Sequence, residues 1–388
     1  MTYRLDKPSG NNLSMLGLGC MRFPRDKNET EALILAAING GVNFFDTAYL
    51  YPNSEKTLGE ILHKHDKRKD VYIATKLPLV LCKSPADFDK YFNEQLKRLR
   101  TDYVDYYFLH NITSFERWDA FDKMGVREWA KSKQDSGQIK QFGFSYHGNN
   151  IDFMKILDAH QWDFTMIQYN YYDENYQAGK KGLVAAAEKG VSVIIMEPLL
   201  GGKLASGLPK EAVKLFENEK PGATPADWAL RWLWNHDEVT VVLSGMSSKE
   251  QVMQNIASAK NFAPLQENEA GVYTKVVEIF KKAFRIPCTG CDYCLPCPKG
   301  INIPACFSAY NAKYAQGFVT AMTMYLTTTA VIAKNPTAPH TCIKCGKCEK
   351  ECPQNIPIMK DLMKVTFALE PLPLRLILKL VRKIMSAR

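Results

Sequence analysis

Short apolar runs alternate with longer amphipathic stretches through the first 265 residues of the chain. Eight of these runs have the length and the β-branched or aromatic content of buried strands. They occupy residues 16–21, 42–47, 71–75, 104–109, 141–145, 165–168, 191–196 and 239–243. Each run precedes a stretch of helical character, such as 31–38, in which Leu33, Ile34 and Ala37 share one face. The pattern therefore predicts eight consecutive β–α units.

Alternating strands and helices predict a parallel sheet. Eight units within about 260 residues predict an α/β fold of the closed (β/α)8 TIM-barrel type, which we place in residues 1–270. A doubly wound open sheet is the alternative. The Gly-x-Gly pair after an early run, Gly17 and Gly19, lacks the third glycine and the strand-to-helix context of a dinucleotide-binding turn. This favours the barrel.

Eight of the eleven cysteines fall into two runs near the end of the chain. Three cysteines in each run are separated by two residues, and the fourth precedes a proline, as in two-cluster bacterial ferredoxins. In that pattern the fourth cysteine of each run ligates the cluster of the other run. We therefore predict two 4Fe-4S clusters. One would be held by Cys288, Cys291, Cys294 and Cys352, and the other by Cys342, Cys345, Cys348 and Cys297.

Structural zinc is the alternative for these cysteines. Zinc sites usually use two C-x2-C pairs that are a dozen or more residues apart, which gives four ligands and no more. Here three thiols crowd each run, which favours iron–sulfur clusters. The first run has two residues, where the signature has three, before Cys297. The exchange of Cys297 and Cys352 is thus less firmly indicated than the two clusters.

About forty residues separate the two runs, more than a compact ferredoxin hairpin needs. Phe307, Tyr310, Tyr314 and Phe318 recur there at helical spacing, which predicts a mostly helical ferredoxin-like module. We place it in residues 271–388, after a linking helix. The end of this region, 374–388, has the pattern of a basic amphipathic helix. Such a helix can dock on protein or make peripheral contact with an anionic membrane surface.

Composition and charge narrow the function classes. No stretch of eighteen apolar residues occurs, and the first residues lack the apolar core of a secretion signal. We therefore expect a cytoplasmic protein, whose reducing compartment suits thiols in cluster runs. The formal net charge is +9. Two oxidised clusters with eight thiolates would lower it to about +5. A surplus of that size does not indicate nucleic-acid binding.

Polar residues follow three of the predicted strands in order. Asp46 ends the second strand, Lys76 lies just past the third and His110 lies just past the fourth, with Tyr51 in the loop after Asp46. In a TIM barrel, chemistry sits at the carboxyl ends of the strands. These four residue types suit carbonyl reduction. A nearby ammonium would lower the pKa of Tyr51 and make it a better proton donor.

These motifs resemble the aldo-keto reductase superfamily. The resemblance rests on residues 45–51 (FDTAYLY), 74–76 (ATK), 109–111 (LHN), 143–145 (GFS) and 197–202 (EPLLGG), and it covers about residues 10–260. The whole chain resembles the subgroup that carries a C-terminal ferredoxin-type domain. By this resemblance Asp46, Tyr51, Lys76 and His110 form a catalytic tetrad in which Tyr51 is the general acid.

The resemblance also implies that NADPH or NADH lies extended across the barrel mouth. Ser145 and Gln168 would hold the nicotinamide carboxamide. The phosphates and adenosine would contact Pro198, Leu199, Gly201, Gly202, Ser244, Gly245, Met246, Ser247, Gln251 and Asn255. Gln251 stands where an arginine often binds the 2′-phosphate of NADP, and Met196 stands where a tyrosine often stacks on the nicotinamide. The choice between NADPH and NADH therefore stays open.

Two functional hypotheses follow. In the first, an oxidoreductase reduces a small aldehyde or ketone with nicotinamide hydride. Its clusters either exchange electrons with a redox partner protein or a bound redox cofactor, or mainly stabilise the fold. Hydride carries two electrons together, whereas each cluster passes one, and nothing in the sequence shows a flavin that would convert between them. In the second, the chain is an electron-transfer subunit whose barrel is a docking scaffold with little reductase activity. The sequence does not indicate an oligomeric state.

Overall fold

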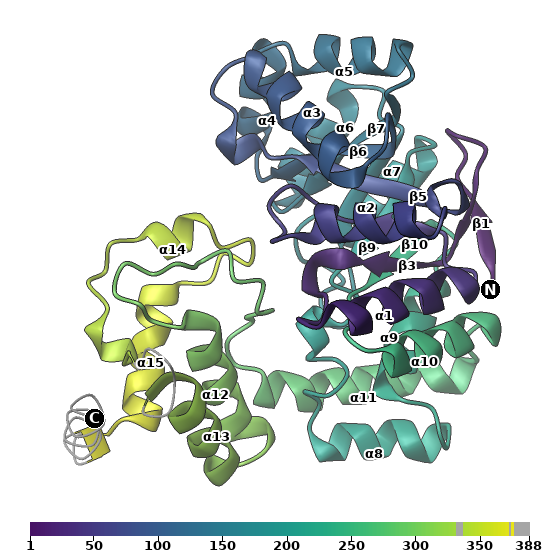
Figure 1. The fold of residues 1–388 in the computed structure, drawn as a ribbon. Coiled ribbons are helices and arrows are strands. Elements are labelled where there is room, and N and C mark those ends of the chain that lie inside the picture. Colours follow the sequence, from purple (N-terminus) through teal and green to yellow (C-terminus); the bar gives the residue numbers. More distant parts are fainter. Residues whose placement is uncertain (331–336, 372–373, 376–388) are drawn as a thin grey trace. The chain divides into compact units, whose positions relative to one another are not determined.

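The computed structural model describes residues 1–330, 337–371 and 374–375. It divides into two compact units, which are described separately (Figure 1). The first consists of Met1–Leu199 and Ala226–Leu265, and the second of Leu200–Pro225 and the described part of Gln266–Arg388. The segment Leu200–Pro225 thus leaves the barrel sequence and packs with the C-terminal residues.

The first unit contains a closed barrel of eight parallel strands, which confirms the predicted fold class. The strands follow one another around the barrel in chain order, and β10 pairs with β3 to close it. They are β3 (Leu16–Gly19), β4 (Phe44–Asp46), β5 (Tyr72–Leu77), β6 (Val104–Ile112), β7 (Ile139–Tyr146), β8 (Phe164–Gln168), β9 (Ser192–Met196) and β10 (Val239–Ser244).

Helices follow the strands and cover the outside of the barrel (Figure 1). They are α1 (Lys27–Asn39), α2 (Ser54–Lys64), α3 (Ala86–Leu99), α4 (Phe115–Lys123), α5 (Val126–Asp135), α6 (Asn150–Ala159), α7 (Gly179–Glu188), α9 (Pro225–Trp234) and α10 (Lys249–Lys260). A separate cluster of large apolar side chains, which includes Phe44, Tyr106, Phe108 and Phe164, fills the barrel interior. The interior is therefore a packed core, on which the site at the strand ends is built.

A short antiparallel hairpin precedes the barrel, and the sequence analysis did not predict it. It consists of β1 (Tyr3–Leu5) and β2 (Asn12–Ser14). Asp6 in its turn is buried and accepts hydrogen bonds from Tyr106 Oη, at 2.5 Å, and from the hydroxyl of Ser192. Since Ser192 is the first residue of β9, the hairpin lies at the end of the barrel where the strands begin.

The second unit is mostly helical, as predicted. Its helices are η4 (Leu200–Gly202), α8 (Lys210–Glu219), α11 (Glu267–Ala283), α12 (Ile303–Ala315), α13 (Phe318–Tyr325), η5 (Leu326–Ala330), η6 (Pro339–Thr341), α14 (Lys347–Lys350) and α15 (Ile358–Leu369). A core of its own joins α12, α13 and α15 around Phe307, Tyr325, Leu362 and Val365. Six of the eight run cysteines pack against this core.

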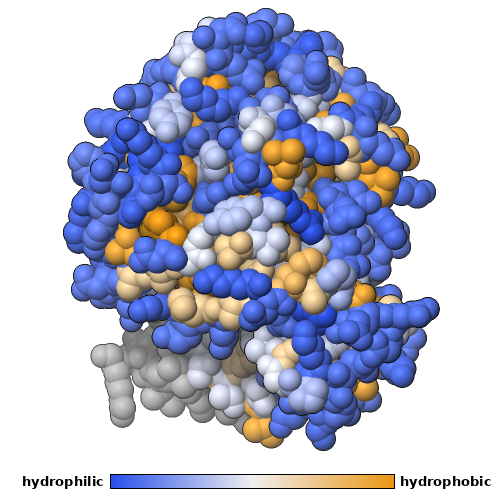
Figure 2. Space-filling view, turned by 90° about the vertical axis from the view of Figure 1, so that its right-hand side faces the viewer, coloured by the Kyte–Doolittle hydropathy of each residue, from blue (hydrophilic) through white to orange (hydrophobic). Residues whose placement is uncertain are grey.

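The surface drawn in Figure 2 is mainly hydrophilic, with small apolar groups between polar ones. Within the described ranges, no helix combines the length and apolar content that crossing a bilayer requires. The predicted amphipathic tail, 374–388, falls outside the described residues except for Leu374 and Arg375. Its docking or membrane contact stays a prediction.

Candidate active site and cysteine-lined cavities

The structure brings the four predicted catalytic residues together at the carboxyl end of the barrel. Asp46 is the last residue of β4, and Tyr51 lies in the loop before α2. Lys76 and His110 were expected just past their strands, but both lie inside them, because β5 continues to Leu77 and β6 to Ile112. Neighbouring strands in register therefore present these side chains at one edge.

A buried ion pair is the centre of the arrangement. Lys76 Nζ donates to Asp46 Oδ1 at 2.6 Å and to the Thr47 carbonyl oxygen at 2.7 Å. Lys76 is 1% exposed and Asp46 is 4% exposed. A buried ammonium is costly unless it is paired and hydrogen-bonded, so these two acceptors fix its position. The Thr47 carbonyl is a contact that the sequence analysis missed.

The two aromatic side chains adjoin this ion pair. Lys76 Nζ lies 4.8 Å from the centroid of the Tyr51 ring. The rings of Tyr51 and His110 meet edge to face, with centroids 6.0 Å apart and an interplanar angle of 86°. The acid, the lysine, the tyrosine and the histidine thus form one contiguous group.

Burial controls the protonation of both rings. It raises the pKa of Tyr51 well above its usual value, and the carboxylate of Asp46 and the thiol of Cys20 add to the shift. Burial lowers the pKa of His110 well below its usual value, helped by the positive charge of Lys76. At neutral pH the site therefore holds a protonated phenol and a neutral imidazole.

The net lowering of the Tyr51 pKa that was expected from Lys76 is not found in this structure. The ammonium lies over the ring and is held by Asp46 and Thr47, while burial of the phenol dominates the shift. Asp46 shows the same balance: burial raises its pKa, and Lys76 only partly opposes the change. The positions of residues in the sequence predict which charges lie near one another. They do not show how far the folded chain excludes water from those charges.

Ser145 and Gln168, the predicted carboxamide ligands, already make hydrogen bonds within the chain. Ser145 Oγ accepts from the backbone N–H of Asn111 at 2.9 Å and so fixes the segment next to His110. Gln168 Nε2 donates to Asp173 Oδ2 at 3.2 Å, and its Oε1 accepts from Gln177 at 3.0 Å. Both residues are buried at strand ends, and their contact with a cofactor stays a prediction.

Asn111 belongs to the motif 109–111 that carries the resemblance, but the sequence analysis assigned it no role. It has a left-handed backbone, with φ 61°, directly after His110. Its side-chain oxygen is buried and makes no hydrogen bond to any residue that the structure describes. Asparagine tolerates this backbone region better than most residues, and left-handed positions gather at functional sites. An Asn that directly follows a strand-end histidine is the signal that could have found it.

The predicted phosphate and adenosine residues fall into two groups. In the first unit, Ser244 and Asn255 are buried and joined by a 3.0 Å hydrogen bond. Gly245 and Ser247 are exposed, and the amide oxygen of Gln251 accepts from the Ser247 N–H at 2.8 Å. Met246 and Pro198 are buried, and Leu199 is half-buried. Residues 245–248 therefore form a partly exposed segment between β10 and α10.

Gly201 and Gly202 lie in the second unit, in η4. A Cβ atom on Gly201 would come within 1.9 Å of the Thr289 carbonyl oxygen, and its φ is 63°. Only glycine fits this contact, which presses η4 against the loop that carries Cys288. The structure therefore gives Gly201 a packing reason that the sequence did not reveal, and its role toward a phosphate stays a prediction.

The cysteine runs line two cavities in the second unit. Cys288, Cys291, Cys294 and Cys352 border the first, of about 310 Å³. Cys297, Cys342, Cys345 and Cys348 border the second, of about 890 Å³, which Cys294 also reaches. The first cavity thus receives three thiols from one run and one from the other, and the second receives three and two. Each includes the four thiols that the ferredoxin spacing grouped together.

The arrangement of the thiols fits clusters. Four thiols border the first cavity and five border the second. Burial raises the pKa of Cys288 to about 11, although the charge of Lys203 opposes the shift. Buried thiolates need positive charge, which cluster iron supplies.

The fold, the strand-end site and the cysteine-lined cavities together define a barrel oxidoreductase with an attached iron–sulfur module. The chain belongs to the aldo/keto reductase family, whose model matches residues 15–278. Residues 287–357 match the model of a 4Fe-4S dicluster domain.

Individual relatives agree with this assignment. The chain is 29% identical to L-galactose dehydrogenase of Arabidopsis thaliana, over 64% of this chain and 83% of the relative. It is 26% identical to L-glyceraldehyde 3-phosphate reductase of Escherichia coli K12, over 67% and 88%. Among solved structures, the holo form of an aldo-keto reductase of Bacillus halodurans superposes with a TM-score of 0.60. It is 26% identical and covers 71% of this chain and 96% of that one.

Proposed function

We propose that this chain reduces a small aldehyde or ketone to an alcohol with hydride from NADPH or NADH, and that Tyr51 donates the proton. The observation that carries the proposal is the buried group at the barrel mouth. There, a lysine held by Asp46 lies 4.8 Å from the centroid of the Tyr51 ring, and His110 meets the edge of that ring.

A bound reduced nicotinamide supplies the hydride that the carbonyl carbon receives. Tyr51 is protonated at neutral pH, because burial raises its pKa well above the usual value, so its hydroxyl can give a proton to the carbonyl oxygen. The C=O double bond would become a C–O single bond, and the products would be the alcohol, the oxidised nicotinamide and a tyrosinate. The Lys76 ammonium close to the ring stabilises that anion.

His110 orients the substrate in this proposal. Its imidazole is neutral, because burial and the charge of Lys76 lower its pKa. A neutral ring keeps one N–H that can donate a hydrogen bond to the carbonyl oxygen without taking the proton of Tyr51. Asp46 has a positioning role, since it holds the Lys76 ammonium and does not reach the reacting atoms itself.

Ser145 and Gln168 would hold the carboxamide of the nicotinamide, and residues 244–248 would face the adenosine and phosphates. The proposal includes both NADPH and NADH, since Met246 and Gln251 bring no cation to that segment. The names of two relatives, an L-galactose dehydrogenase and an L-glyceraldehyde 3-phosphate reductase, support a small carbonyl compound as the substrate class.

The variant Tyr51→Phe tests the proton donor. We expect carbonyl turnover to fall by about 10²–10⁴-fold, the usual contribution of a general acid, while saturable NADPH or NADH binding persists. Tyr49→Phe is a matched control, because the Tyr49 hydroxyl donates to Glu94 Oε2 at 2.8 Å outside the group. Unchanged turnover in Tyr51→Phe would refute the assignment.

A second candidate function is electron transfer by the cluster module, with the barrel as a docking scaffold for a redox partner protein. The internal hydrogen bonds of Ser145 and Gln168 favour it, since a nicotinamide would have to replace them. Anaerobic holoprotein, for which we expect about eight irons per chain, should be titrated with NADH and NADPH. Binding with carbonyl turnover supports the reductase. Absence of binding supports the scaffold.

A further inference from the structure

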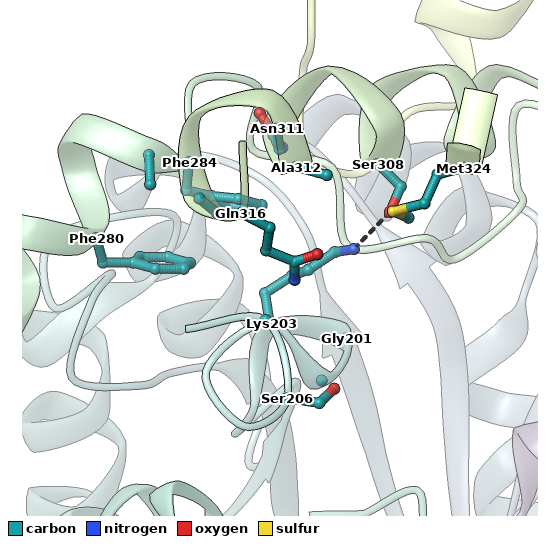
Figure 3. Close-up of a pocket in the computed structure, with 14 residues that line it drawn as sticks. Gly201, Lys203, Ser206, Phe280, Phe284, Ser308, Asn311, Ala312, Gln316 and Met324 are labelled. Carbon is teal, nitrogen blue, oxygen red and sulfur yellow. Dashed lines mark hydrogen bonds between the residues drawn. The ribbon is translucent and has the colours of Figure 1, made fainter. Parts of the chain in front are cut away.

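A cavity in the second unit lies outside both the barrel site and the cysteine-lined cavities. Its walls come from η4 and the residues after it, from the end of α11, and from α12 and α13 (Figure 3). It is open to solvent and holds about 650 Å³ of space, solvent included. Apolar side chains on one side face a few polar groups on the other, as in most ligand pockets.

Lys203 gives the cavity its charge. It is the only charged side chain among the described residues that line the cavity. Its ammonium reaches from the loop toward α12, where it donates to Ser308 Oγ at 3.1 Å (Figure 3). Gln316 and Ser206 add an amide and a hydroxyl that can donate hydrogen bonds. A lining with one cation and neutral donors suits an anionic group.

The opposite wall is aromatic and well fixed. Phe280 and Phe284 on α11 stack on each other, with centroids 4.8 Å apart and an interplanar angle of 21°. Asn311 anchors α12 to the segment after α11: its oxygen accepts from the backbone N–H groups of Arg285 and Ile286, and its Nδ2 donates to the Ile286 carbonyl at 2.7 Å. This wall suits a flat apolar group.

We propose that this cavity binds a small aromatic anion, a carboxylate or a phosphate ester, whose charged group pairs with Lys203 and whose ring lies against Phe280 and Phe284. Gly201 and Gly202 line this cavity and are also predicted phosphate contacts of the nicotinamide cofactor, so competition with NADPH distinguishes the two sites. The cavity adjoins the first cysteine cavity, because Gly201 packs against the carbonyl of Thr289, which lines the cysteine cavity.

The position of Lys203 gives a second readout. Its positive charge acts on Cys288, one of the predicted ligands of the first cluster. An anion bound to Lys203 offsets part of that charge, so the cluster becomes harder to reduce. Ligand binding is therefore expected to shift the midpoint potential of one cluster to a more negative value and to leave the other unchanged.

The test uses the full-length holoprotein, purified anaerobically, and isothermal titration calorimetry. Phenyl phosphate and benzoate distinguish a phosphate ester from a carboxylate. We expect one of them to bind saturably at one site per chain. Inorganic phosphate lacks the ring and benzyl alcohol lacks the charge, so each should bind at least about tenfold more weakly. An electron paramagnetic resonance titration of the same samples follows the cluster potentials.

Three variants and a control locate the site. Lys203→Gln should weaken binding about tenfold, whereas Lys203→Arg should retain it. Ala315→Leu fills the cavity from α12 and should also weaken binding. Lys210→Gln, which changes an exposed lysine at the start of α8, should have no effect. The cluster absorbance of each variant shows that it has folded, and the Ala315 variant tests the cavity independently of Lys203.

Several results would overturn the proposal. One is the absence of saturable binding by both aromatic anions. Another is binding that neither Lys203→Gln nor Ala315→Leu weakens. A third is displacement of the aromatic anion by NADPH, one for one, which would make the cavity part of the nicotinamide site. Loss of NADPH binding alone would refute the proposed reductase and leave this site intact.

Discussion

The barrel site and the cysteine module handle buried charge in opposite ways. In the barrel, the ammonium of Lys76 is neutralised by Asp46 and hydrogen-bonded to the Thr47 carbonyl, so the chain itself supplies every partner. In the module, eight thiols border two cavities, and burial is the main cause that raises the pKa of Cys288 to about 11. Cluster iron would supply the positive charge that stabilises those thiolates.

This difference implies that the two units are stabilised in different ways. The barrel site rests on a large apolar core and a closed ring of strands. The module has a smaller core, and six cysteines form part of its packing: Cys288, Cys294, Cys297, Cys342, Cys348 and Cys352. Metal binding in such small domains is coupled to folding. The barrel should therefore keep its structure without iron, and the module should not.

The largest expected effect comes from iron removal. Chelation under anaerobic conditions should lower hydrogen-exchange protection in α12 and α15 by about ten-thousandfold, or about 5.5 kcal/mol, because the cysteine loops lose what holds them together. Protection in β5 and β6 should not change. Mass spectrometry of both regions in one sample provides the control. Equal losses in both units would contradict the comparison.

The second prediction tests whether the barrel site is stabilised by its own residues. Lys76→Met leaves the Asp46 carboxylate buried without its cation and should cost about 3–5 kcal/mol of unfolding free energy. The double variant with Asp46→Asn should recover part of that loss. All six tryptophans belong to the first unit, so urea unfolding followed by tryptophan emission reports on the barrel alone.

A matched surface pair provides the control for that experiment. Lys123 and Asp119 form an ion pair on α4 with exposed side chains, so Lys123→Met should cost less than about 1 kcal/mol. If Lys76→Met costs as little as the surface variant, the buried pair is not what orders the site.

The sequence predicted the barrel because apolar runs and helical periodicity repeat eight times, and no local detail is needed for that conclusion. The residue at which a strand ends depends on the strands that pair with it. β6 continues through His110 to Ile112, because it pairs with β7 up to Tyr146. The first hairpin escaped prediction because its strands have three residues each, and what holds it is Asp6, whose partners lie 100 and 186 residues away.

The candidate site shows the same limit. Motif and strand-end position brought Asp46, Tyr51, Lys76 and His110 into one group, and the cysteine spacing anticipated which thiols share a cavity. The direction of the Tyr51 pKa was missed because burial exceeds the effect of a neighbouring charge. The contact between Gly201 and Thr289 was missed because it depends on how two distant segments pack.

A third prediction concerns the pH dependence of the barrel. Burial lowers the pKa of His147 to about 4, against about 6.5 in an unfolded chain. As the pH falls below 6.5, the unfolded state binds a proton that the folded state does not bind. Stability should therefore decrease between pH 6.5 and 4, by about 3 kcal/mol from this group. His110 acts in the same direction.

Urea unfolding followed by tryptophan emission at pH 7, 5.5 and 4 measures this effect. His147→Gln should flatten the dependence, whereas His63→Gln, at an exposed position of α2, should leave it as in the wild type. The same slope in His147→Gln and wild type would show that burial of this imidazole does not govern the acid sensitivity of the barrel.

The smallest effects compare one helix cap in each unit. The side chain of Asn149 accepts from the Asp152 N–H at the start of α6, and that of Asn302 accepts from the Ala305 N–H at the start of α12. Each Asn→Ala variant should cost about 1 kcal/mol, the usual value of an N-cap. Tryptophan emission reports on Asn149→Ala, and hydrogen exchange of α12 reports on Asn302→Ala.

The iron dependence of the two variants separates the units. If iron is the main source of stability in the module, the effect of Asn302→Ala should be masked in the holoprotein and should emerge as iron is withdrawn. Asn149→Ala should cost the same with or without iron. Equal iron dependence for both caps would mean that the two units do not differ in the origin of their order.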